Sequence, residues 1–304
     1  MATVTKKLNP AQIQALYKKL KPLAVRESQP QYTHWQLKTS EMTVTAYTSG
    51  KVVYQGKDVD WLKDDNDVPA KTKTGSASKN APASASGRLA NTFPQAGSDE
   101  VGNGDFLGPF VVASVIVPDA ETAQILHDLK VTDSKAMTDE AIRKVAPRLL
   151  ELLPCSIQVL DNTRYNEIYD RQTMNLNTIK ALMHNQAYLN LIQKGHALPK
   201  LVVIDQFCQP KTYYSYLKNQ PEVIRTIHFE TKAESKYPAV AAASVLARWK
   251  FLQVMDALED KYGMPLAKGG GAQATASAKK IQAKFGREEL KHVAKLHFVN
   301  MNKL

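Results

Sequence analysis

Two adjacent carboxylates, Asp99 and Glu100, stand directly before a glycine turn, Gly102-Asn103-Gly104. The mostly apolar stretch 109–117 follows this turn and predicts a buried strand. We therefore expect the two acids close to the core, where an ionised carboxylate is costly unless a cation neutralises it. Oxygen-only ligands suit a hard divalent ion such as Mg²⁺. The alternative is an acidic surface turn, because turns are rich in Asp and Gly.

Three more acids stand where α/β proteins carry catalytic groups. Asp205 ends the apolar run 201–204, which predicts a buried strand, and active sites of α/β sheets gather at strand ends. By itself, an Asp after a strand is more often a turn former or a helix cap. Glu230 and Glu234 precede an Ala-rich helix expected over 239–262, and either of them can face the site. An exposed, salt-bridged helix entrance is the alternative for these two residues.

Size and composition narrow the class of protein. The 304 residues are enough for one domain of ordinary size and a smaller one. Hydrophobic residues make up 43% and charged residues 23%, which excludes collagen-like, coiled-coil and largely disordered classes. Because no apolar run reaches the ~18–20 residues that cross a bilayer and no signal-peptide core opens the chain, we expect a soluble, cytoplasmic protein. Cys155 and Cys208 lie beside apolar segments and predict buried, reduced thiols.

The formal net charge is +11, which attracts polyanions at long range and makes nucleic acid the leading partner class. The excess is uneven, since residues 1–91 carry 14 Lys and Arg against 7 Asp and Glu. This distribution indicates a basic module joined to a less basic one. Solubility alone is the competing explanation for the charge.

Three segments are expected along the chain. Residues 1–68 form a small basic α+β domain, and 69–95, rich in Ala, Ser, Thr, Lys, Gly and Pro, form a flexible linker. Residues 96–304 alternate strands and helices, which predicts an α/β sheet with helices packed on it. In the first segment we expect a helix at 10–20 and strands at 32–37, 42–47 and 52–56. In the last we expect strands at 110–117, 155–160, 201–204 and 223–229, and helices at 121–129, 140–153, 174–194 and 239–262.

Two other features have less pointed interpretations. His184 and His297 lie among apolar neighbours and are predicted to be packed or surface histidines rather than metal ligands. The glycine run 268–272 lacks the preceding strand and the Gly-Lys-Ser/Thr ending of a nucleotide-binding loop. It predicts a mobile loop that borders the substrate.

Taken in order along the chain, the short motifs resemble bacterial ribonuclease HIII, a type 2 ribonuclease H. They are Gly-Ser-Asp-Glu-Val-Gly-x-Gly-Asp at 97–105, Asp-Ser-Lys at 133–135, Asp205, Thr-Lys-Ala-Glu-Ser at 231–235 and Ala-Ala-Ala-Ser at 241–244. Each motif is short, but their joint order is specific, and the likeness spans nearly the whole chain. It implies a ribonuclease-H-like catalytic domain preceded by a small domain that resembles the TATA-binding protein.

The resemblance implies a metal-dependent endonuclease that hydrolyses the RNA strand of an RNA/DNA hybrid and leaves 5′-phosphate and 3′-hydroxyl ends. The catalytic, metal-binding acids fall on Asp99, Glu100, Asp205 and Glu234, with Asp99 as the expected bridging ligand and Glu230 as the less favoured one. The expected cofactor is Mg²⁺ or Mn²⁺. Two such cations about 3.5–4 Å apart activate a water on one side of a phosphate and stabilise the leaving oxygen on the other.

The glycine turn corresponds to the family segment whose backbone contacts ribose 2′-hydroxyls, the groups that distinguish RNA from DNA. We expect substrate contacts from the backbone of Gly102, Asn103 and Gly104. Asn103 stands where we expect Thr in type III and Arg in type II, so the family's side-chain contact is not carried over to this position. Lys135 and Lys232 are expected to contact phosphates, with solvated surface lysines as the alternative. The expected partner is an RNA/DNA hybrid, with no membrane, no obligate protein partner and a monomeric state.

Two alternative functions stay open from the sequence. One is a type II ribonuclease H that incises at single ribonucleotides in DNA. Glu234, where type II enzymes usually carry Asp, and the extra amino-terminal domain favour type III. The other alternative is a non-catalytic nucleic-acid-binding protein on a degenerate nuclease fold, which the presence of all four acids disfavours.

Overall fold

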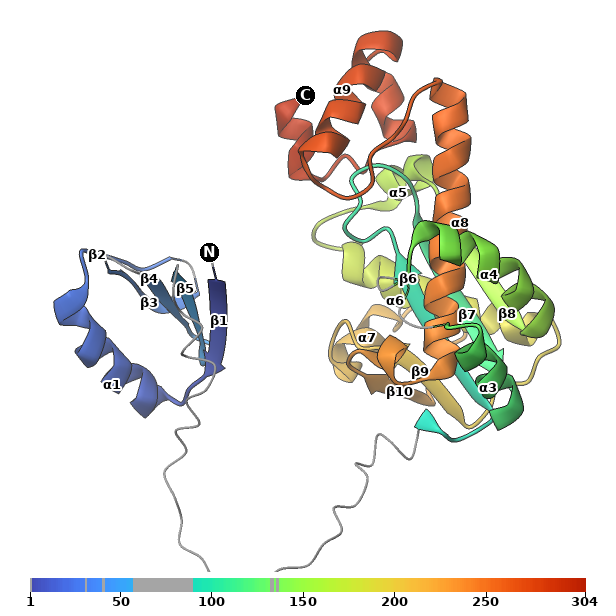
Figure 1. Ribbon diagram of the computed structural model, residues 1–304, viewed down its shortest axis with the longest axis horizontal. Coiled ribbons are helices and arrows are strands. Elements are labelled where there is room, and N and C mark those ends of the chain that lie inside the picture. Colours follow the sequence, from blue (N-terminus) through green and yellow to red (C-terminus); the bar gives the residue numbers. More distant parts are fainter. Residues whose placement is uncertain (1, 31, 40–41, 57–89, 132–133, 135–136) are drawn as a thin grey trace, which may run out of the picture. The chain divides into compact units, whose positions relative to one another are not determined.

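The computed structural model describes residues 2–30, 32–39, 42–56, 90–131, 134 and 137–304. It divides the chain into two compact units, Met1–Lys79 and Asn80–Leu304, which are described separately (Figure 1). The limits expected for the small domain, the linker and the catalytic domain stay predictions, since 57–89 lie outside the described residues. From residue 90 onward the chain is packed, because Ala90 and Gln95 are buried.

The amino-terminal unit is a five-stranded antiparallel sheet with order β1-β5-β4-β3-β2, and it packs against one helix. Asn9 caps that helix and Gln12 completes a capping box. The predicted helix and three strands are confirmed, whereas β1 and β2 were not predicted. The likeness to the TATA-binding protein stays a prediction. The elements are β1 (Ala2–Lys7), α1 (Pro10–Leu20), η1 (Lys21–Leu23), β2 (Arg26–Ser28), β3 (Thr33–Lys38), β4 (Met42–Tyr47) and β5 (Lys51–Gly56).

The second unit contains a mixed five-stranded sheet with order β10-β9-β6-β7-β8. Strand β6 pairs in parallel with β9 and antiparallel with β7. The strands are β6 (Gln95–Val101), β7 (Phe110–Val117), β8 (Cys155–Leu160), β9 (Leu201–Asp205) and β10 (Ile227–Glu230). The helices are α3 (Ala120–Asp128), α4 (Asp139–Leu152), α5 (Asn162–Ile168), α6 (Leu176–Gln193), α7 (Pro210–Tyr216), η4 (Ala233–Ser235), α8 (Pro238–Tyr262), α9 (Ala272–Phe285), η5 (Arg287–His292) and η6 (Val299–Lys303).

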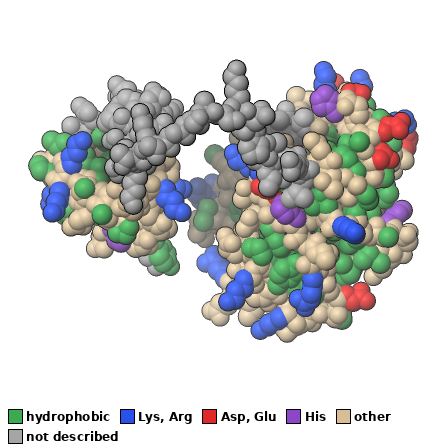
Figure 2. Space-filling view, turned by 90° about the horizontal axis from the view of Figure 1, so that it is seen from below, with side chains coloured by type: hydrophobic (Ala, Val, Ile, Leu, Met, Phe, Trp, Pro, Cys, Tyr) green, Lys and Arg blue, Asp and Glu red, His purple; other side chains and the backbone are tan. Residues whose placement is uncertain are grey.

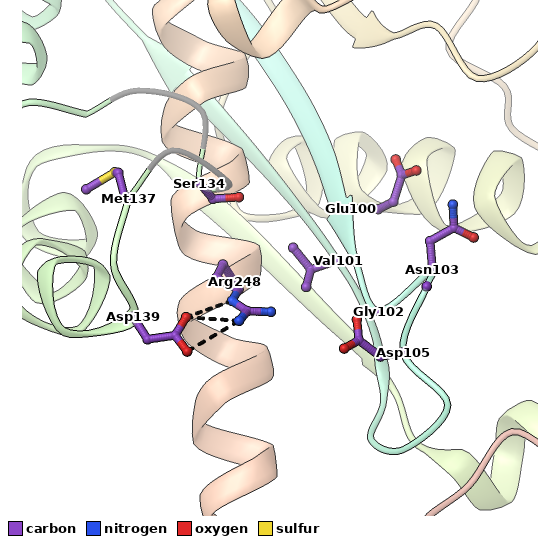
Figure 3. A pocket seen from close by; sticks show the side chains of 10 residues that line it. Glu100, Val101, Gly102, Asn103, Asp105, Ser134, Met137, Asp139 and Arg248 are labelled. Atoms are coloured by element: carbon purple, nitrogen blue, oxygen red, sulfur yellow. Dashed lines mark hydrogen bonds and ion pairs between the residues drawn. The ribbon is translucent and has the colours of Figure 1, made fainter. Parts of the chain in front are cut away.

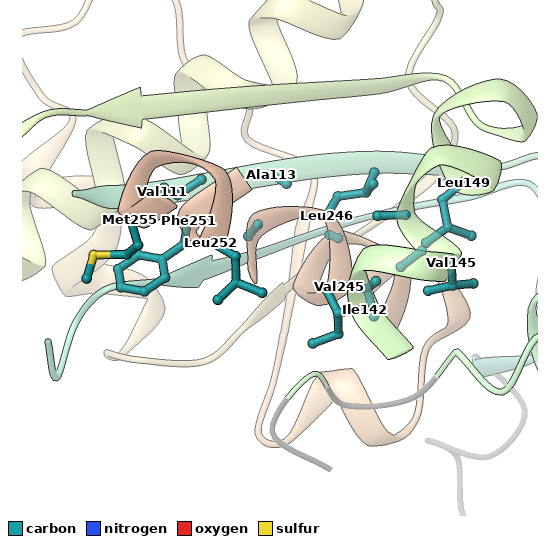
Figure 4. Packing of buried hydrophobic residues seen from close by; sticks show 14 of the residues in the cluster. Val111, Ala113, Ile142, Val145, Leu149, Val245, Leu246, Phe251, Leu252 and Met255 are labelled. Carbon is teal, nitrogen blue, oxygen red and sulfur yellow. The ribbon is translucent and has the colours of Figure 1, made fainter. Parts of the chain in front are cut away.

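Helices α8 and α6 cover opposite faces of this sheet, because alternate residues of β6 contact one helix or the other. Gly97 faces α8, where a Cβ atom would lie 2.4 Å from the backbone nitrogen of Val240. The glycine therefore allows the long helix to lie directly on the central strand. The core beside it contains Val245, Leu246, Phe251 and Leu252 of α8, Val111 and Ala113 of β7, and Ile142, Val145 and Leu149 of α4 (Figure 4).

Several element predictions need correction. Residues 97–101 of the acidic motif lie in strand β6, which was not among the expected strands, so the alternative of an acidic surface turn is wrong for Asp99 and Glu100. The strand expected at 223–229 is limited to Ile227–Glu230, and α5, α7 and α9 were not predicted. Both cysteines are free but only partly buried. In the described part of the chain, no helix has the length and apolar character needed to cross a bilayer.

Candidate active site

Two neighbouring parallel strands bring Asp99 and Asp205 to the same region of the sheet. Ser98 of β6 is paired with Ile204 of β9, and each is followed directly by one of the two acids. Adjacent strands lie about 4.7–4.9 Å apart, so the backbones that carry these carboxylates are close. The sheet register, which the sequence does not display, therefore joins acids that are separated by more than a hundred residues.

The third segment of the site is the turn at the entrance to α8. The backbone N–H of Ala233 donates to Asp205 Oδ1 at 2.9 Å, which ties the η4 turn to the end of β9. Lys232 precedes it in the left-handed region with φ 55°, and this reversal sends Glu234 into the protein. The Glu234 side chain is buried, with the residue only 9% exposed. The η4 turn thus holds Glu234 near the end of β9, where Asp205 lies.

The carboxyl group of Asp99 lies on the α8 face of the sheet. Burial raises its pKa well above the usual range, and the negative charges of Glu100 and Asp205 raise it further. Hydrogen bonds from the Glu100 backbone N–H, at 2.7 Å, and from the Ser244 hydroxyl act in the opposite direction. This environment therefore favours the protonated form of Asp99, and positive charge placed next to it would favour the ionised form.

The carboxylate of Glu100 lies on the other face, against α6. Its Oε1 is ion-paired with Lys180, and its Oε2 lies 2.9 Å from His184 Nε2. Burial alone would raise the pKa of Glu100, but the hydrogen bond and charge of His184, together with Lys180, lower it to about 2. His184 is packed, as expected, yet its contact with a site acid was missed. The signal in the sequence was the i, i+4 spacing of Lys180 and His184 on one helix face.

The side chains as they stand do not form a closed metal cage. Among the described residues, no three His, Cys, Asp or Glu side chains converge closely enough to hold an ion. Asp99 and Glu100 turn to opposite faces, as neighbours in a strand do. Their backbone positions, with those of Asp205 and Glu234, lie around one end of the β6–β9 pair, and all the donors are carboxylate oxygens. This donor chemistry suits Mg²⁺ or Mn²⁺.

Beside the acids, the glycine turn lines a pocket of about 330 Å³ (Figure 3). Gly102 has φ +99°, and a Cβ atom there would lie 2.2 Å from the carbonyl oxygen of Pro109, so only glycine fits. Gly104 has no atom within 4 Å of the position of a Cβ and lies open. The pocket wall is formed by residues 100–105 of the acidic segment, by Ser134, Met137 and Asp139, and by Arg248 of α8.

Arg248 lines the far side of this pocket beside Asp139, and a second cation, Lys268, contacts Asp139 as well. Arg248 donates to Asp139 through Nε at 3.0 Å, and Lys268 Nζ lies 3.0 Å from the same carboxylate. These contacts lower the pKa of Asp139 although burial alone would raise it. The pocket therefore has the acidic segment on one side and the Arg248–Asp139 ion pair on the other.

The carboxy-terminal segment supports the glycine turn from behind. The N–H of Gly269 donates to Asp105 Oδ1 at 2.6 Å, and its carbonyl accepts from the N–H of Phe106. Lys295, only 1% exposed, donates to the carbonyl oxygens of Asp105, Gly108 and Pro109 at 2.8, 2.7 and 3.3 Å. The predicted border loop at 268–272 is therefore bonded to the chain that carries the turn.

The remaining predicted residues are more scattered. Lys135 lies outside the described residues, and Lys232 is exposed at the entrance to η4. Glu230 is ion-paired with Lys236 at 2.5 Å on the outer strand β10, which agrees with its lower rank as a ligand. His297 stacks on Tyr169 with ring centroids 4.1 Å apart.

Comparison with known proteins agrees with this arrangement. The family model described as Ribonuclease HII matches residues 96–301, and the model described as Domain of unknown function (DUF3378) matches residues 3–79. Ribonuclease HIII from Bacillus cereus (strain ATCC 10987) is 43% identical over 282 residues, which cover 90% of this chain and 89% of the relative. Ribonuclease HIII from Bacillus anthracis is 43% identical over 286 residues, with the same coverage of each chain.

Solved structures extend the likeness to the whole fold. The crystal structure of Bst-RNase HIII in complex with Mn²⁺ matches with a TM-score of 0.70 and 34% identity, covering 99% of this chain and 97% of that one. The crystal structure of Aquifex aeolicus RNase H3, at 24% identity and a TM-score of 0.55, shares the fold over 97% of this chain and 100% of its own. With both units matched in sequence and structure, the chain belongs to the ribonuclease HIII branch of the ribonuclease HII family.

Proposed function

We propose that this protein is an endonuclease that hydrolyses the RNA strand of RNA/DNA hybrids with divalent metal ions, leaving 5′-phosphate and 3′-hydroxyl ends. The observation that carries the proposal is the register of β6 and β9, which places Asp99 beside Asp205. The Ala233–Asp205 hydrogen bond adds Glu234 to the same region. The family assignment makes a metal-dependent hydrolase the expected class of enzyme.

We infer that Asp99, Glu100, Asp205 and Glu234 hold the metal. Two bound divalent ions would activate the attacking water and stabilise the leaving 3′-oxygen. The residues themselves supply oxygen ligands from three separate elements, and the pKa of Asp99 is raised by burial and by the charges of Glu100 and Asp205. Ionisation of Asp99 is therefore tied to the arrival of positive charge. Either Mg²⁺ or Mn²⁺ satisfies this donor set, and the Mn²⁺ complex of Bst-RNase HIII supports Mn²⁺ as one of them.

Recognition of RNA is assigned to the backbone of the glycine turn. The left-handed φ of Gly102 bends the chain after β6, and the absence of a side chain at Gly104 lets a ribose approach closely. Asn103 lines the same pocket, whereas the opposite wall carries Arg248. We propose that the turn contacts 2′-hydroxyl groups and that Lys135 and Lys232 contact phosphates.

The amino-terminal unit is proposed to supply much of the affinity for the hybrid. Among its described residues, which end at 56, eight Lys and Arg stand against a single acid, Glu27. Figure 2 shows Lys and Arg side chains on the visible faces of both units. Because contacts with phosphates release counterions, binding should weaken as salt rises. We also propose that the protein acts as a monomer without an obligate protein partner.

The test of the function is cleavage of a labelled RNA/DNA hybrid by the purified protein with and without Mg²⁺ or Mn²⁺. We expect metal-dependent products with 5′-phosphate ends from the wild-type chain and none above background from Asp99→Asn. An Asp99→Asn protein that cleaves at the wild-type rate in saturating metal would contradict the metal mechanism. Binding of the hybrid without any cleavage in either metal would favour the non-catalytic alternative.

Type II specificity is tested by two substrates cut side by side. One is a DNA duplex with a single embedded ribonucleotide, and the other carries a long RNA tract. We expect faster cleavage of the tract. A clear preference for the single ribonucleotide would reassign the chain to type II specificity.

A further inference from the structure

Both oxygens of the Glu100 carboxylate are already bonded within the protein, and by the same helix. Lys180 and His184 lie one turn apart on α6 and bind Oε1 and Oε2 respectively. Lys180 is 5% exposed and His184 is fully buried, so both contacts with Glu100 lie inside the protein rather than on its surface. Lys180 and His184 therefore contact a proposed metal ligand, although neither of them is itself a proposed ligand.

A second layer of contacts fixes the side chains of Lys180 and His184. Ser98, two residues before Glu100 on the same face of β6, lies 2.7 Å from His184 Nδ1 through its Oγ. Since Nε2 donates to the ionised carboxylate, this contact sets the orientation of the imidazole ring. The ring of Phe207, two residues after Asp205, stacks on His184 with centroids 5.6 Å apart and lies 4.6 Å from Lys180 Nζ. The loop after β9 thus covers the pair.

The contacts with Lys180 and His184 do not use every lone pair of the Glu100 carboxylate. An ionised carboxylate has about four lone-pair sites, two on each oxygen, and Lys180 and His184 occupy one on each. Glu100 can therefore bind a cation without releasing either contact. Partners of this kind orient a metal ligand, and their loss commonly weakens metal binding by about 10–100-fold.

We propose that Lys180 and His184 are positioning residues that fix the direction of the Glu100 carboxylate before the metal binds. The inference rests on the metal site proposed above. It assigns α6 a role in metal affinity, whereas a merely structural role would affect only folding. Lys180 and His184 are not assigned contact with the substrate.

The test is titration of the metal-free, full-length protein with Mn²⁺ by isothermal calorimetry in the absence of nucleic acid. The variants are Lys180→Met and His184→Phe, which keep much of the volume and remove the contacts with Glu100. We expect each to weaken Mn²⁺ binding by about 10–100-fold. In cleavage assays at saturating Mn²⁺, KM for the hybrid should stay near the wild-type value. Lys180→Arg, which keeps the charge, should recover most of the affinity for Mn²⁺.

Lys194→Met is the matched control. It removes the same charge from the end of the same helix, about 20 Å along the axis at 1.5 Å per residue. Its Mn²⁺ affinity should equal that of the wild type. If circular dichroism shows that Lys180→Met or His184→Phe is unfolded, Lys180→Gln and His184→Gln replace them, with weaker Mn²⁺ binding again expected.

Two results would overturn the inference. One is unchanged Mn²⁺ affinity in folded variants at both positions, even if cleavage is lost. The other is tighter binding by Lys180→Met, which would show that Lys180 competes with the metal. A wild-type protein that binds Mn²⁺ in a Lys180-dependent way but does not cut hybrids would contradict the proposed activity and leave the positioning role standing. A wild-type protein that binds no Mn²⁺ would overturn both.

Discussion

Asp99 and Glu100 are consecutive residues of β6, yet their carboxyl groups face opposite sides of the sheet and their pKa values move in opposite directions. Asp99 contacts Ser244 of α8 and has no cationic partner among the causes of its raised pKa. Glu100 is held by Lys180 and His184 of α6. The difference in pKa follows from the different helices that the two faces meet.

Replacing Asp99 with Asn should stabilise the metal-free protein. The folded-state pKa of Asp99 is raised above its unfolded value, so the acid costs stability as the pH rises above about 4, the unfolded pKa. The neutral amide lacks this cost, which is about 1.4 kcal/mol for every tenfold weakening of the acid on folding. We expect a higher Tm for Asp99→Asn at pH 7 in EDTA, with a gain that shrinks as the pH approaches 4.

Asp128→Asn is the control for this measurement. Asp128 ends helix α3 with an exposed side chain, and its replacement should change stability by no more than about 0.5 kcal/mol. Adding Mn²⁺ should raise the Tm of the wild type and of Asp128→Asn but not that of Asp99→Asn. A lower Tm for Asp99→Asn in EDTA at pH 7 would contradict the interpretation of its pKa.

Asp205→Asn should leave the fold intact and impair cleavage. The amide oxygen of Asn can still accept the N–H of Ala233, so the link to the η4 turn is retained. The charge that a cation needs is lost. We expect an unchanged or higher Tm. Cleavage should fall by more than the factor of about 10–100 that is typical when a residue contacting a metal ligand is replaced. Cleavage within about twofold of the wild type would remove Asp205 from the site.

The two glycines of the turn should respond differently to alanine. Gly102→Ala places a Cβ against the Pro109 carbonyl at a positive φ, so we expect a loss of stability of about 1–3 kcal/mol. Gly104→Ala meets no atom within 4 Å and should leave the Tm nearly unchanged. If the turn contacts ribose, the new methyl group at Gly104 should still raise KM for the hybrid. Wild-type kinetics for Gly104→Ala would argue against that contact.

Lys295→Met should weaken the support of the glycine turn. Three carbonyl oxygens lose their shared donor in a buried place, and an unsatisfied buried acceptor costs about 1–3 kcal/mol. We expect a lower midpoint in urea unfolding together with slower cleavage. Lys279→Met, at an exposed position of α9, is the control and should leave both unchanged. Equal stability of Lys295→Met and the wild type would show that the three hydrogen bonds of Lys295 are dispensable for folding.

Removing the amino-terminal unit should weaken binding more than it disturbs the catalytic fold. The cut belongs before residue 90, because Gln95 Nε2 donates to the carbonyl of Ala90 at 2.9 Å and both residues are buried. We expect the protein that starts at residue 90 to bind a hybrid more weakly, with a smaller dependence of affinity on salt. An unchanged dissociation constant and salt slope would assign substrate binding to the catalytic unit alone.

The α/β class and most long elements were predicted from the sequence alone and are confirmed, whereas the role of the four acids stays a prediction. The apolar run 201–204 and the stretch 110–117 are recognisable because buried strands need continuous hydrophobic residues. The acidic motif and its order relative to Asp205 and Glu234 were sufficient to predict the ribonuclease HIII family, which the comparisons confirm. These features are local, so they are visible in a single chain without coordinates.

Only the tertiary structure decided which neighbours each acid meets. The β6–β9 register places Asp99 next to Asp205, and the opposite faces of one strand send Asp99 toward α8 and Glu100 toward α6. Lys180, His184 and Lys295 act through contacts with residues between 80 and 190 positions away, which no local pattern encodes. The types of residue determine which chemistry is available, whereas charge state and direction depend on packing, because both are set by distance and by burial.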